Sequence, residues 1–244
     1  MWHLRPLVSA ALEPLPGCCQ VCGHWPAQPV CTDCRQRFAR GRARCQACAS
    51  PLLSAQPLCG ACLTRPDRSP LAGCVALVDY DFPWDGLIAR WKFQRESGWS
   101  RTWADLLMRD PQVLALWHQC SRAVPVPVST ARLGERGFNQ AWELLKAMQR
   151  RAPAPHPLLL AQALVRVRET PDQHSLARDE RLRNLRGALV AHPAHATALR
   201  GQHVLLVDDV STTGATLEAA AQALLDAGAA RVSACVLART PPPH

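Results

Sequence analysis

The stretch His203-Val-Leu-Leu-Val-Asp-Asp-Val-Ser-Thr-Thr-Gly-Ala-Thr216 decides the fold of this chain. Its four apolar residues from Val204 to Val207 predict a short buried strand of the kind found inside a parallel sheet. Two carboxylates, Asp208 and Asp209, stand at the carboxyl end of this strand, and a turn rich in hydroxyl groups follows. An Ala- and Leu-rich segment over 217–227 then predicts a helix. The stretch therefore predicts a strand-turn-helix unit of an α/β fold.

The turn between this strand and the helix has the composition of a phosphate site. Ligands of open parallel sheets lie beyond the carboxyl ends of the strands, and a helix start offers free N–H groups. The acidic pair can accept hydrogen bonds from a sugar diol or hold Mg²⁺ through water. The alternative is an acidic turn and a threonine-capped helix that bind no ligand. The candidate phosphate-binding residues are Ser211, Thr212, Thr213, Gly214, Ala215 and Thr216.

Composition restricts the class of protein. The 244 residues have room for one medium domain and a small one, and 48% of them are hydrophobic. No apolar run reaches the length of a transmembrane helix, so we expect a cytoplasmic protein without membrane insertion. The net charge is +9, and Lys92 and Lys146 are the only lysines among 28 basic residues. This arginine excess indicates either a polyanionic partner or a coding bias toward Arg, Ala and Pro.

The cysteines point to metal binding. Four Cys-x-x-Cys pairs follow one another: Cys19/Cys22, Cys31/Cys34, Cys45/Cys48 and Cys59/Cys62. Two such pairs complete a tetrahedral zinc shell, so the sequence predicts one or two structural zinc ions. Sequential pairing and a crossed arrangement of the first pair with the third are both open. Redox chemistry is disfavoured, because a redox Cys-x-x-Cys normally sits near a βαβ pattern that is absent here.

Arginines are concentrated between the second and third cysteine pairs. Phe38 lies among them, and a basic module that bears an aromatic residue could bind single-stranded nucleic acid. The alternative is a solvated arginine-rich loop. A proline-containing connection over 64–70 separates this region from the rest, so we expect an N-terminal Cys-rich module over 1–70 and a second domain over 71–244. The arginines concerned are Arg35, Arg37, Arg40, Arg42 and Arg44.

The remaining chain alternates between predicted strands and helices. Lys92 and Arg95, at the end of a helix over 84–93, could reach the phosphate site, but we expect them to be surface cations. Ser129 and Arg132 follow a strand over 123–128, where a loop carrying arginines is well placed for a diphosphate. The polar stretch over 164–184, which includes Arg166 and Arg168, has the character of an active-site lid. Further strands are expected over 74–80, 187–190 and 231–238, the second of them re-entering the sheet, and further helices over 103–108, 113–120 and 140–148.

Taken in order, these motifs resemble the ComF family, the competence-associated, phosphoribosyltransferase-like proteins. The resemblance rests on the cysteine pairs, on Val-Pro-Val-Pro at 124–127 with Arg-Gly-Phe-Asn-Gln at 136–140, on Arg-x-Arg-x-Thr-x-x-Gln at 166–173, on Arg-x-x-Asn at 181–184, and on the signature at 207–216. It implies a type I phosphoribosyltransferase fold, a parallel sheet flanked by helices, behind a small zinc-binding module. Ser211 departs from the pattern, since an apolar residue is common at its position.

The resemblance also implies roles for residues. Asp208 and Asp209 would be catalytic and face the ribose hydroxyls of phosphoribosyl pyrophosphate (PRPP), while Thr212 to Thr216 would cradle its 5′-phosphate. Ser129 to Arg132 would face the pyrophosphate with its Mg²⁺, and Arg166 to Gln173 would lie in the mobile loop. The family is associated with the handling of imported single-stranded DNA during natural transformation, which implies competence proteins as partners.

Three functions follow as hypotheses. The first is a DNA-handling protein of natural transformation that keeps a PRPP pocket. The second is an active Mg²⁺-dependent phosphoribosyltransferase on an unidentified nucleobase, although no segment that would read a base is recognisable. The third is a non-enzymatic regulator that senses PRPP.

Overall fold

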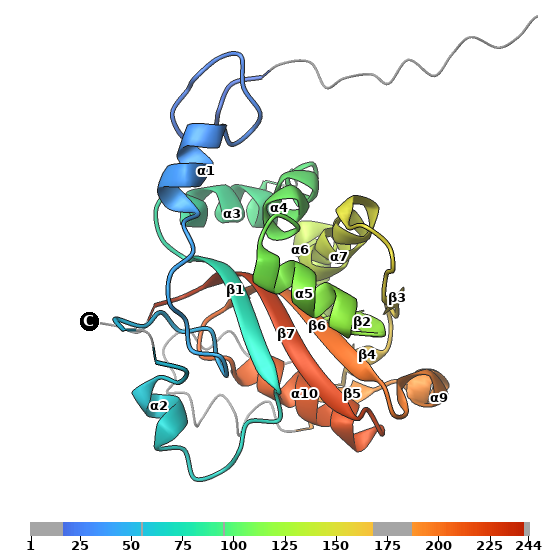
Figure 1. The fold of residues 1–244 in the computed structure, drawn as a ribbon. Helices are drawn as coiled ribbons and strands as arrows, with labels where there is room; N and C mark the ends of the chain where they lie inside the picture. The colour runs from blue at the N-terminus through green and yellow to red at the C-terminus, as the bar shows by residue number, and fades with distance from the viewer. Residues whose placement is uncertain (1–16, 55, 95, 168–186, 242–244) are drawn as a thin grey trace, which may run out of the picture.

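A computed structural model describes residues 17–54, 56–94, 96–167 and 187–241. Its centre is a five-stranded parallel sheet in the order β1-β7-β6-β2-β3 (Figure 1). The strands are β1 (Gly73–Asp79), β2 (Arg122–Pro125), β3 (Leu158–Leu159), β6 (His203–Ser211) and β7 (Arg231–Arg239). The strands expected over 74–80 and 231–238 are thereby confirmed, whereas the one expected over 123–128 already ends at Pro125.

The strand expected to re-enter the sheet at 187–190 does not do so. This segment forms β5 (Leu189–Ala191), which pairs antiparallel with β4 (Leu164–Arg166) in a separate two-stranded sheet. The prediction of a place in the main sheet was therefore wrong, because a short apolar run does not specify the strand with which it pairs. Residues 168–186, the centre of the expected lid, lie outside the described residues, as do residues 1–16.

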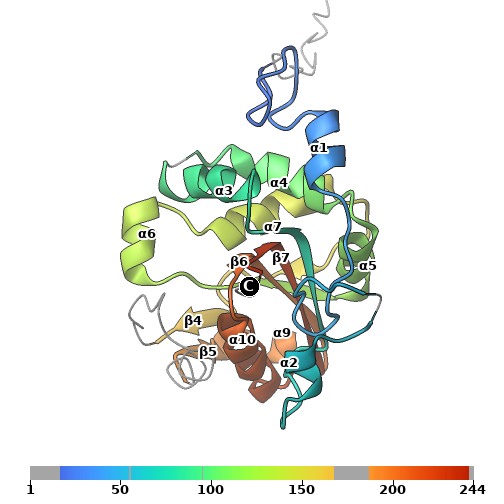
Figure 2. The ribbon, with the colours of Figure 1, turned by 90° about the vertical axis from the view of Figure 1, so that its left-hand side faces the viewer.

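Helices cover both faces of the sheet (Figure 2). One face carries α3 (Trp84–Phe93), α4 (Trp99–Leu107), α5 (Pro111–Gln119) and α7 (Gln140–Arg151), and the other carries α10 (Ala215–Asp226). The remaining helices are α1 (Thr32–Phe38), α2 (Gly60–Leu63), α6 (Thr130–Arg136), the 3-10 turn η1 (Pro193–His195) and α9 (Ala196–Leu199). The helices expected over 84–93, 103–108, 113–120 and 140–148 are confirmed, and the one expected over 217–227 begins two residues earlier than its sequence indicates. No helix of the described ranges combines the length and apolar composition that a membrane span requires.

Successive side chains of β6 pack alternately into two separate hydrophobic cores, one on each face of the sheet. Leu205 and Val207 pack into the core under α3, α4 and α7, where Trp91, Trp103 and Trp117 are fully buried. The intervening residues of β6 face the second core under α10. Because successive side chains of a strand point to opposite faces, four consecutive apolar residues bury both sides of the sheet.

The chain connections change direction between β6 and β2, and we call the region at the carboxyl ends of these two strands the crevice. From β6 the chain passes through α10 to β7, whereas from β2 it passes through α6 and α7 to β3, so the connections leave in opposite directions. Ligands of open α/β sheets bind at such a switch point, outside the carboxyl ends of the strands. The last β2 residue, Pro125, pairs with Val207, while β6 continues against β7 as far as Ser211. The acidic pair thus lies within β6 rather than after it, just beyond the end of β2.

The two halves of the cysteine-rich segment pack on different faces of the sheet. Cys19, Cys31 and Cys34 belong to the core under α3 and α4, and Ala49 is buried in the core under α10. In Figure 1, α1 and α2, which contain the last cysteine of the first and second halves, accordingly lie far apart. The expected boundary at residue 70 stays a prediction.

Candidate functional site

The acidic pair of β6 is joined by a lysine from α3. Nζ of Lys92 lies 3.0 Å from Oδ1 of Asp209, and their side chains are only 13% and 10% exposed. The expectation that Lys92 is a surface cation was therefore wrong. Because α3 follows β1 and crosses the carboxyl edge of the sheet, its last turn reaches β6. Arg95 lies outside the described residues.

A buried arginine supplies a second positive charge near the acidic pair. Arg136, the last residue of α6, is 7% exposed, and its Nη1 donates to Oε1 of Gln140 at 3.1 Å. Its guanidinium lies 5.2 Å from the ring centre of Phe93, a side chain that is 66% exposed. Burial lowers the pKa of Arg136, while the nearby charge of Asp209 acts in the opposite direction.

The acidic pair holds a proton close to neutral pH. Burial and then repulsion from Asp209 raise the pKa of half-buried Asp208 to about 7, although Lys92 and Arg166 oppose the shift. The two adjacent carboxylates repel one another, and the positive charges of Lys92, Arg136 and Arg166 offset this repulsion only in part. The site is therefore suited to a ligand that brings hydrogen-bond donors or a cation to the pair.

The hydroxyl-rich turn forms the start of α10. Gly214 adopts a left-handed conformation with φ of 86°, which a residue with a Cβ atom adopts only with strain, and α10 begins at Ala215. Oγ1 of Thr213 accepts from the N–H of Ala215 at 3.4 Å. Ser211 is 4% exposed, and among the described residues its Oγ has no hydrogen-bond partner. A buried hydroxyl without a partner close to the start of a helix fits a phosphate oxygen.

The predicted pyrophosphate loop is a helix start. Ser129 caps α6 and accepts from the N–H of Arg132 at 3.3 Å, so Arg132 belongs to the helix and not to a loop. Ser129 is a favourable N-cap, and Thr130 to Leu133 contain no glycine or proline, so the first turn of α6 forms although Gly134 follows. Arg166 ends β4 close enough to influence Asp208, whereas Arg168 lies outside the described residues. The structure thus gathers charges from β6, α3, α6 and β4 at one crevice.

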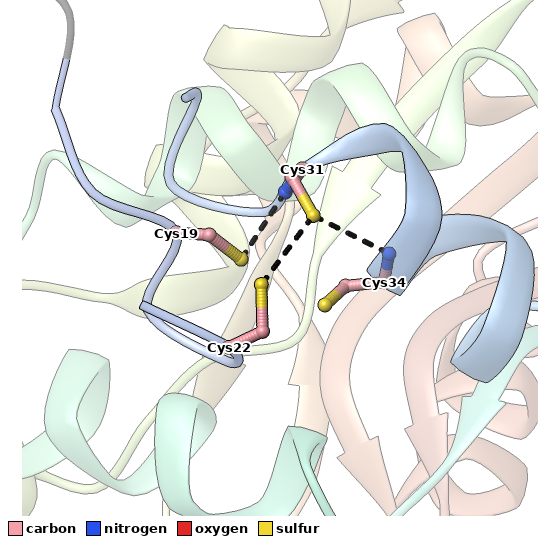
Figure 3. Close-up of side chains that lie close together, drawn as sticks. All are labelled: Cys19, Cys22, Cys31 and Cys34. Atoms are coloured by element: carbon pink, nitrogen blue, oxygen red, sulfur yellow. Dashed lines mark hydrogen bonds between the residues drawn. The ribbon is translucent and has the colours of Figure 1, made fainter. Parts of the chain in front are cut away.

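The first cysteine cluster comprises Cys19, Cys22, Cys31 and Cys34, whose sulfur atoms point toward one another (Figure 3). The Sγ atoms of Cys22 and Cys31 are 3.7 Å apart, and those of the whole cluster lie within 4.8 Å of one another. A tetrahedral zinc ion with Zn–S bonds of about 2.3 Å separates its sulfur ligands by about 3.8 Å. Burial opposes ionisation of Cys19, but backbone N–H groups outweigh it and lower the pKa of this thiol to about 6. The four sulfur atoms fit a closed zinc site.

The second cysteine cluster comprises Cys45, Cys48, Cys59 and Cys62. The Sγ atoms of Cys48 and Cys59 are 3.7 Å apart, again the edge of a zinc tetrahedron. Burial opposes ionisation of Cys48, but hydrogen bonds with Ser50 lower the pKa of this thiol to about 7, while burial and the charge of Cys48 raise the pKa of Cys62. Of the two pairings left open by the sequence, the structure has the sequential one. Cys18 is exposed and belongs to neither cluster.

Four of the five arginines of the run line a hollow of about 200 Å³ at the carboxyl end of β1, whereas Arg35 lines the larger hollow beside the first cysteine cluster. Arg42 and Arg44 both pair with Asp79, the last residue of β1, so two of the five predicted nucleic-acid contacts share one carboxylate, which offsets one of their two charges. Arg37 and Arg40 are exposed. The other three contact neighbouring residues of the run: Arg35 the hydroxyl of Thr32, Arg37 the ring of Phe38, and Arg40 the carbonyl of Gln36.

An exposed aromatic residue completes this hollow. Phe82 is 69% exposed and meets the ring of Phe38 edge to face, with ring centres 5.6 Å apart. The hollow opens at the same edge of the sheet as the acidic pair, because β1, β7 and β6 are parallel neighbours. Helix α3 connects the two places, since Trp84 at its start lines the hollow and Lys92 at its end contacts Asp209. A larger open hollow of about 1060 Å³ lies away from the acidic pair, between the first cysteine cluster and α4.

The sequence interpretation did not identify the partners of four charged residues. Lys92 lies in the last turn of α3, Glu218 is buried in the Ala-rich α10, and Arg239 ends the apolar strand β7. Arg65, in the predicted linker, pairs with Glu218. A charged residue in an apolar element needs a partner when it is buried, which is the signal that could have identified three of them.

Comparisons with known proteins agree with this geometry. Residues 166–242 match the family model of the phosphoribosyl transferase domain. The chain is 33% identical over 237 residues to DNA utilization protein YhgH of Escherichia coli (strain K12), with 93% of this chain and 98% of that protein covered. It is 30% identical to Competence protein F of Haemophilus influenzae, with 86% and 90% covered. It is 28% identical to Competence protein ComFC of Bacillus subtilis (strain 168), with 88% and 86% covered.

Proposed function

This chain belongs to the ComF family, and on that premise we propose that it binds PRPP in the crevice between β6 and β2 and handles single-stranded DNA. Its parallel sheet with flanking helices is a type I phosphoribosyltransferase-like domain. The observation that carries the proposal is the position of the acidic pair Asp208–Asp209. The pair lies near the end of β6, the loop that starts α10 follows it directly, and both lie at a switch point of the sheet.

The proposed ligand uses both halves of the crevice. Asp208 and Asp209 accept hydrogen bonds from the two ribose hydroxyls, and Ser211 to Thr216 hold the 5′-phosphate through hydroxyl and N–H groups. Arg136 and Arg166 bring positive charge toward the pyrophosphate. Mg²⁺ bound with the pyrophosphate would neutralise part of its charge. Ribose hydroxyls that reach Asp209 compete with Lys92 for the same carboxylate, so ligand binding and the position of α3 depend on one another.

The proposed DNA surface is the arginine-lined hollow at the end of β1. Arg37 and Arg40 supply charges that no acid neutralises among the ion pairs of the described residues, and the ring of Phe82 offers a surface for base stacking. The names of the relatives, DNA utilization protein and Competence protein, support a role with DNA. Competence proteins are the partners that such a role implies, and the cytoplasm is where we propose that it acts.

A second candidate function is phosphoribosyl transfer to a nucleobase. The observation that favours it is Phe93, an exposed ring that lies against Arg136 beside the acidic pair. An exposed aromatic face at this position could stack on a base next to the anomeric carbon. Transfer would form a bond from a base nitrogen to that carbon and release pyrophosphate. A screen of nucleobases for pyrophosphate release tests this candidate directly, and no release with any base would leave binding without turnover.

Calorimetry with Mg²⁺ and PRPP tests the main proposal. We expect saturable binding to the wild-type chain and none to the Asp208→Asn/Asp209→Asn variant. An asparagine amide has no negative charge, and its NH2 group is a donor where the ribose hydroxyls need an acceptor. Asp105→Asn, which changes a half-exposed carboxylate on α4, is the matched control. Equal binding to all three proteins would place PRPP elsewhere and reject the proposal.

A further inference from the structure

We propose that the second cysteine cluster positions the phosphate loop Ser211–Thr216, and that Arg239 is the positioning residue that joins them. This inference rests on the proposed function, because it concerns the loop assigned there to the 5′-phosphate. It adds a role for a metal site that the sequence interpretation treated as structural only, and it assigns the two cysteine clusters different tasks.

Arg239 bonds the cysteine cluster and the phosphate loop at the same time. On one side its Nε donates to the carbonyl of Cys48 at 3.0 Å, and its Nη2 donates to Oγ of Ser50 at 3.2 Å. On the other side its Nη1 donates to the carbonyl of Ser211 at 3.1 Å, the first residue of the loop. The residue is 7% exposed, so these bonds form away from water, where an unmade one is costly.

A second contact holds the far end of the loop. Arg65, which follows the last cysteine of the cluster closely, forms a two-bond pair with Glu218, at 2.6 and 2.9 Å. Glu218 is 5% exposed and stands in the first turn of α10, just after Thr216. A forked arginine–carboxylate pair fixes orientation as well as distance. The loop is therefore held at its start by Arg239 and at its end by Arg65, and both contacts lead to the second cysteine cluster.

The backbone between these contacts is held in a strained form. Ala49, which separates Cys48 from Ser50, has a φ of 57°, a left-handed conformation that is unfavourable for a residue with a side chain. Its side chain is fully buried in the core that contains Leu217 of α10. The N–H of Ala49 donates to the carbonyl of Cys45 at 2.8 Å, within the turn that carries two of the four sulfur ligands. A metal ion that fixes this turn therefore also fixes the acceptors of Arg239.

The first cysteine cluster has no comparable contact within the described residues. It packs on the opposite face of the sheet, under α3 and α4, and Arg90 of α3 contacts its segment through Gln20. The two clusters therefore differ in what they can affect. Loss of metal from the second cluster loosens Ser211 and α10, whereas loss from the first loosens the packing on α3.

The coupling must act in both directions. If metal in the second cluster favours the loop conformation that binds a phosphate, then an occupied loop favours retention of that metal by the same factor. If Arg239 were purely structural, its substitution would lower the stability of the fold, but metal binding and phosphate binding would not affect one another. We expect the factor to be about tenfold, within the usual range of coupling between sites.

The test compares two pairs of variants. Arg239→Lys keeps the positive charge, but a single ammonium group cannot reach all the hydrogen-bond acceptors of Arg239. Cys62→Ser removes one sulfur ligand of the second cluster. Their matched controls are Arg122→Lys, whose arginine also donates to two backbone carbonyls but at the amino end of β2, and Cys22→Ser in the first cluster. Circular dichroism confirms the folding of each protein, and Ser50→Ala replaces any variant that does not fold.

Three readouts separate the possible results. Hydrogen exchange of residues 211–218 without ligand should be faster in Arg239→Lys and Cys62→Ser and unchanged in the controls. PRPP should bind these two variants about tenfold more weakly, and saturating PRPP should slow zinc release from the second cluster in the wild type but not in Arg239→Lys. Unchanged exchange in both test variants overturns the inference. If the wild type fails to bind PRPP, the proposed function is wrong, and hydrogen exchange alone then decides whether Arg239 positions the loop.

Discussion

Nζ of Lys92 lies 3.0 Å from Oδ1 of Asp209, so a helix that follows the first strand delivers a cation to the acidic pair of the third strand in the sheet order. The ion pair of Lys92 and Asp209 is largely buried, and its lysine offsets one carboxylate charge of the crevice when no ligand is bound. The same helix begins at the arginine-lined hollow. One rigid element thus connects the proposed sites for PRPP and DNA.

Lys92→Met should lower the free energy of unfolding by about 2 kcal/mol, because it leaves the carboxylate of Asp209 buried without its partner. Urea denaturation at neutral pH measures the change. Adding Asp209→Asn to this variant removes the unpaired charge, so the double variant should recover part of the loss. If the two single effects simply add, Lys92 and Asp209 do not interact, and the account of the crevice is wrong.

PRPP affinity should rise between pH 6 and pH 8. The free site holds a proton because burial and Asp209 raise the pKa of Asp208 to about 7, whereas ribose hydroxyls bind the ionised carboxylate. Binding therefore releases a proton below pH 7, and affinity increases as the pH passes the raised pKa. Calorimetry in two buffers of different ionisation enthalpy measures the proton release.

The phosphates of PRPP also titrate, so the pH series needs a variant without the carboxyl group. In Asp208→Asn the rise that comes from this residue should disappear, leaving the titration of the ligand itself. A variant with the same pH dependence as the wild type would show that Asp208 remains ionised in the free protein.

Metal analysis should find two zinc ions per chain, since each cysteine cluster has sulfur atoms at the spacing of a zinc tetrahedron. Cys22→Ser and Cys62→Ser should each reduce the content to about one, and excess chelator should lower the thermal stability of the wild type. Wild-type protein that holds fewer than two ions while all its thiols are reduced contradicts this assignment.

Arg37→Ala/Arg40→Ala should weaken the binding of a short single-stranded DNA and reduce the salt dependence of its affinity, because two contacts with phosphates are lost. Asp79→Asn is the informative counterpart. It releases Arg42 and Arg44 from their shared carboxylate, so DNA affinity should increase. Fluorescence anisotropy at several salt concentrations measures both, and unchanged affinity in both variants removes the hollow from the DNA surface.

Features that depend on neighbouring residues could be predicted from the sequence. The strand over 204–207, the turn at Gly214 and the four Cys-x-x-Cys pairs follow from local spacing, and the structure contains each of them. The sequence could not distinguish sequential from crossed cysteine pairing, because the same spacing permits both. The structure has the sequential pairing, in which the two halves pack on different faces of the sheet.

Contacts across the fold could not be predicted in this way. The partners of Lys92, Arg239 and Arg65 come from distant segments that the sheet order brings together. The place of β5 depends likewise on pairing, which its three residues do not specify. The segment after β2 was expected to be a loop, but Ser129 caps a helix there, so Arg132 lies in α6.

Calorimetric titration of Mg²⁺ and PRPP into the wild-type chain, with and without a saturating short single-stranded DNA, tests the central claim most directly. The account predicts that PRPP binds in both experiments and that DNA changes its affinity, because α3 touches both sites. Equal PRPP affinity in the two titrations would contradict the claim that the pocket takes part in DNA handling, and absence of PRPP binding would contradict the pocket itself.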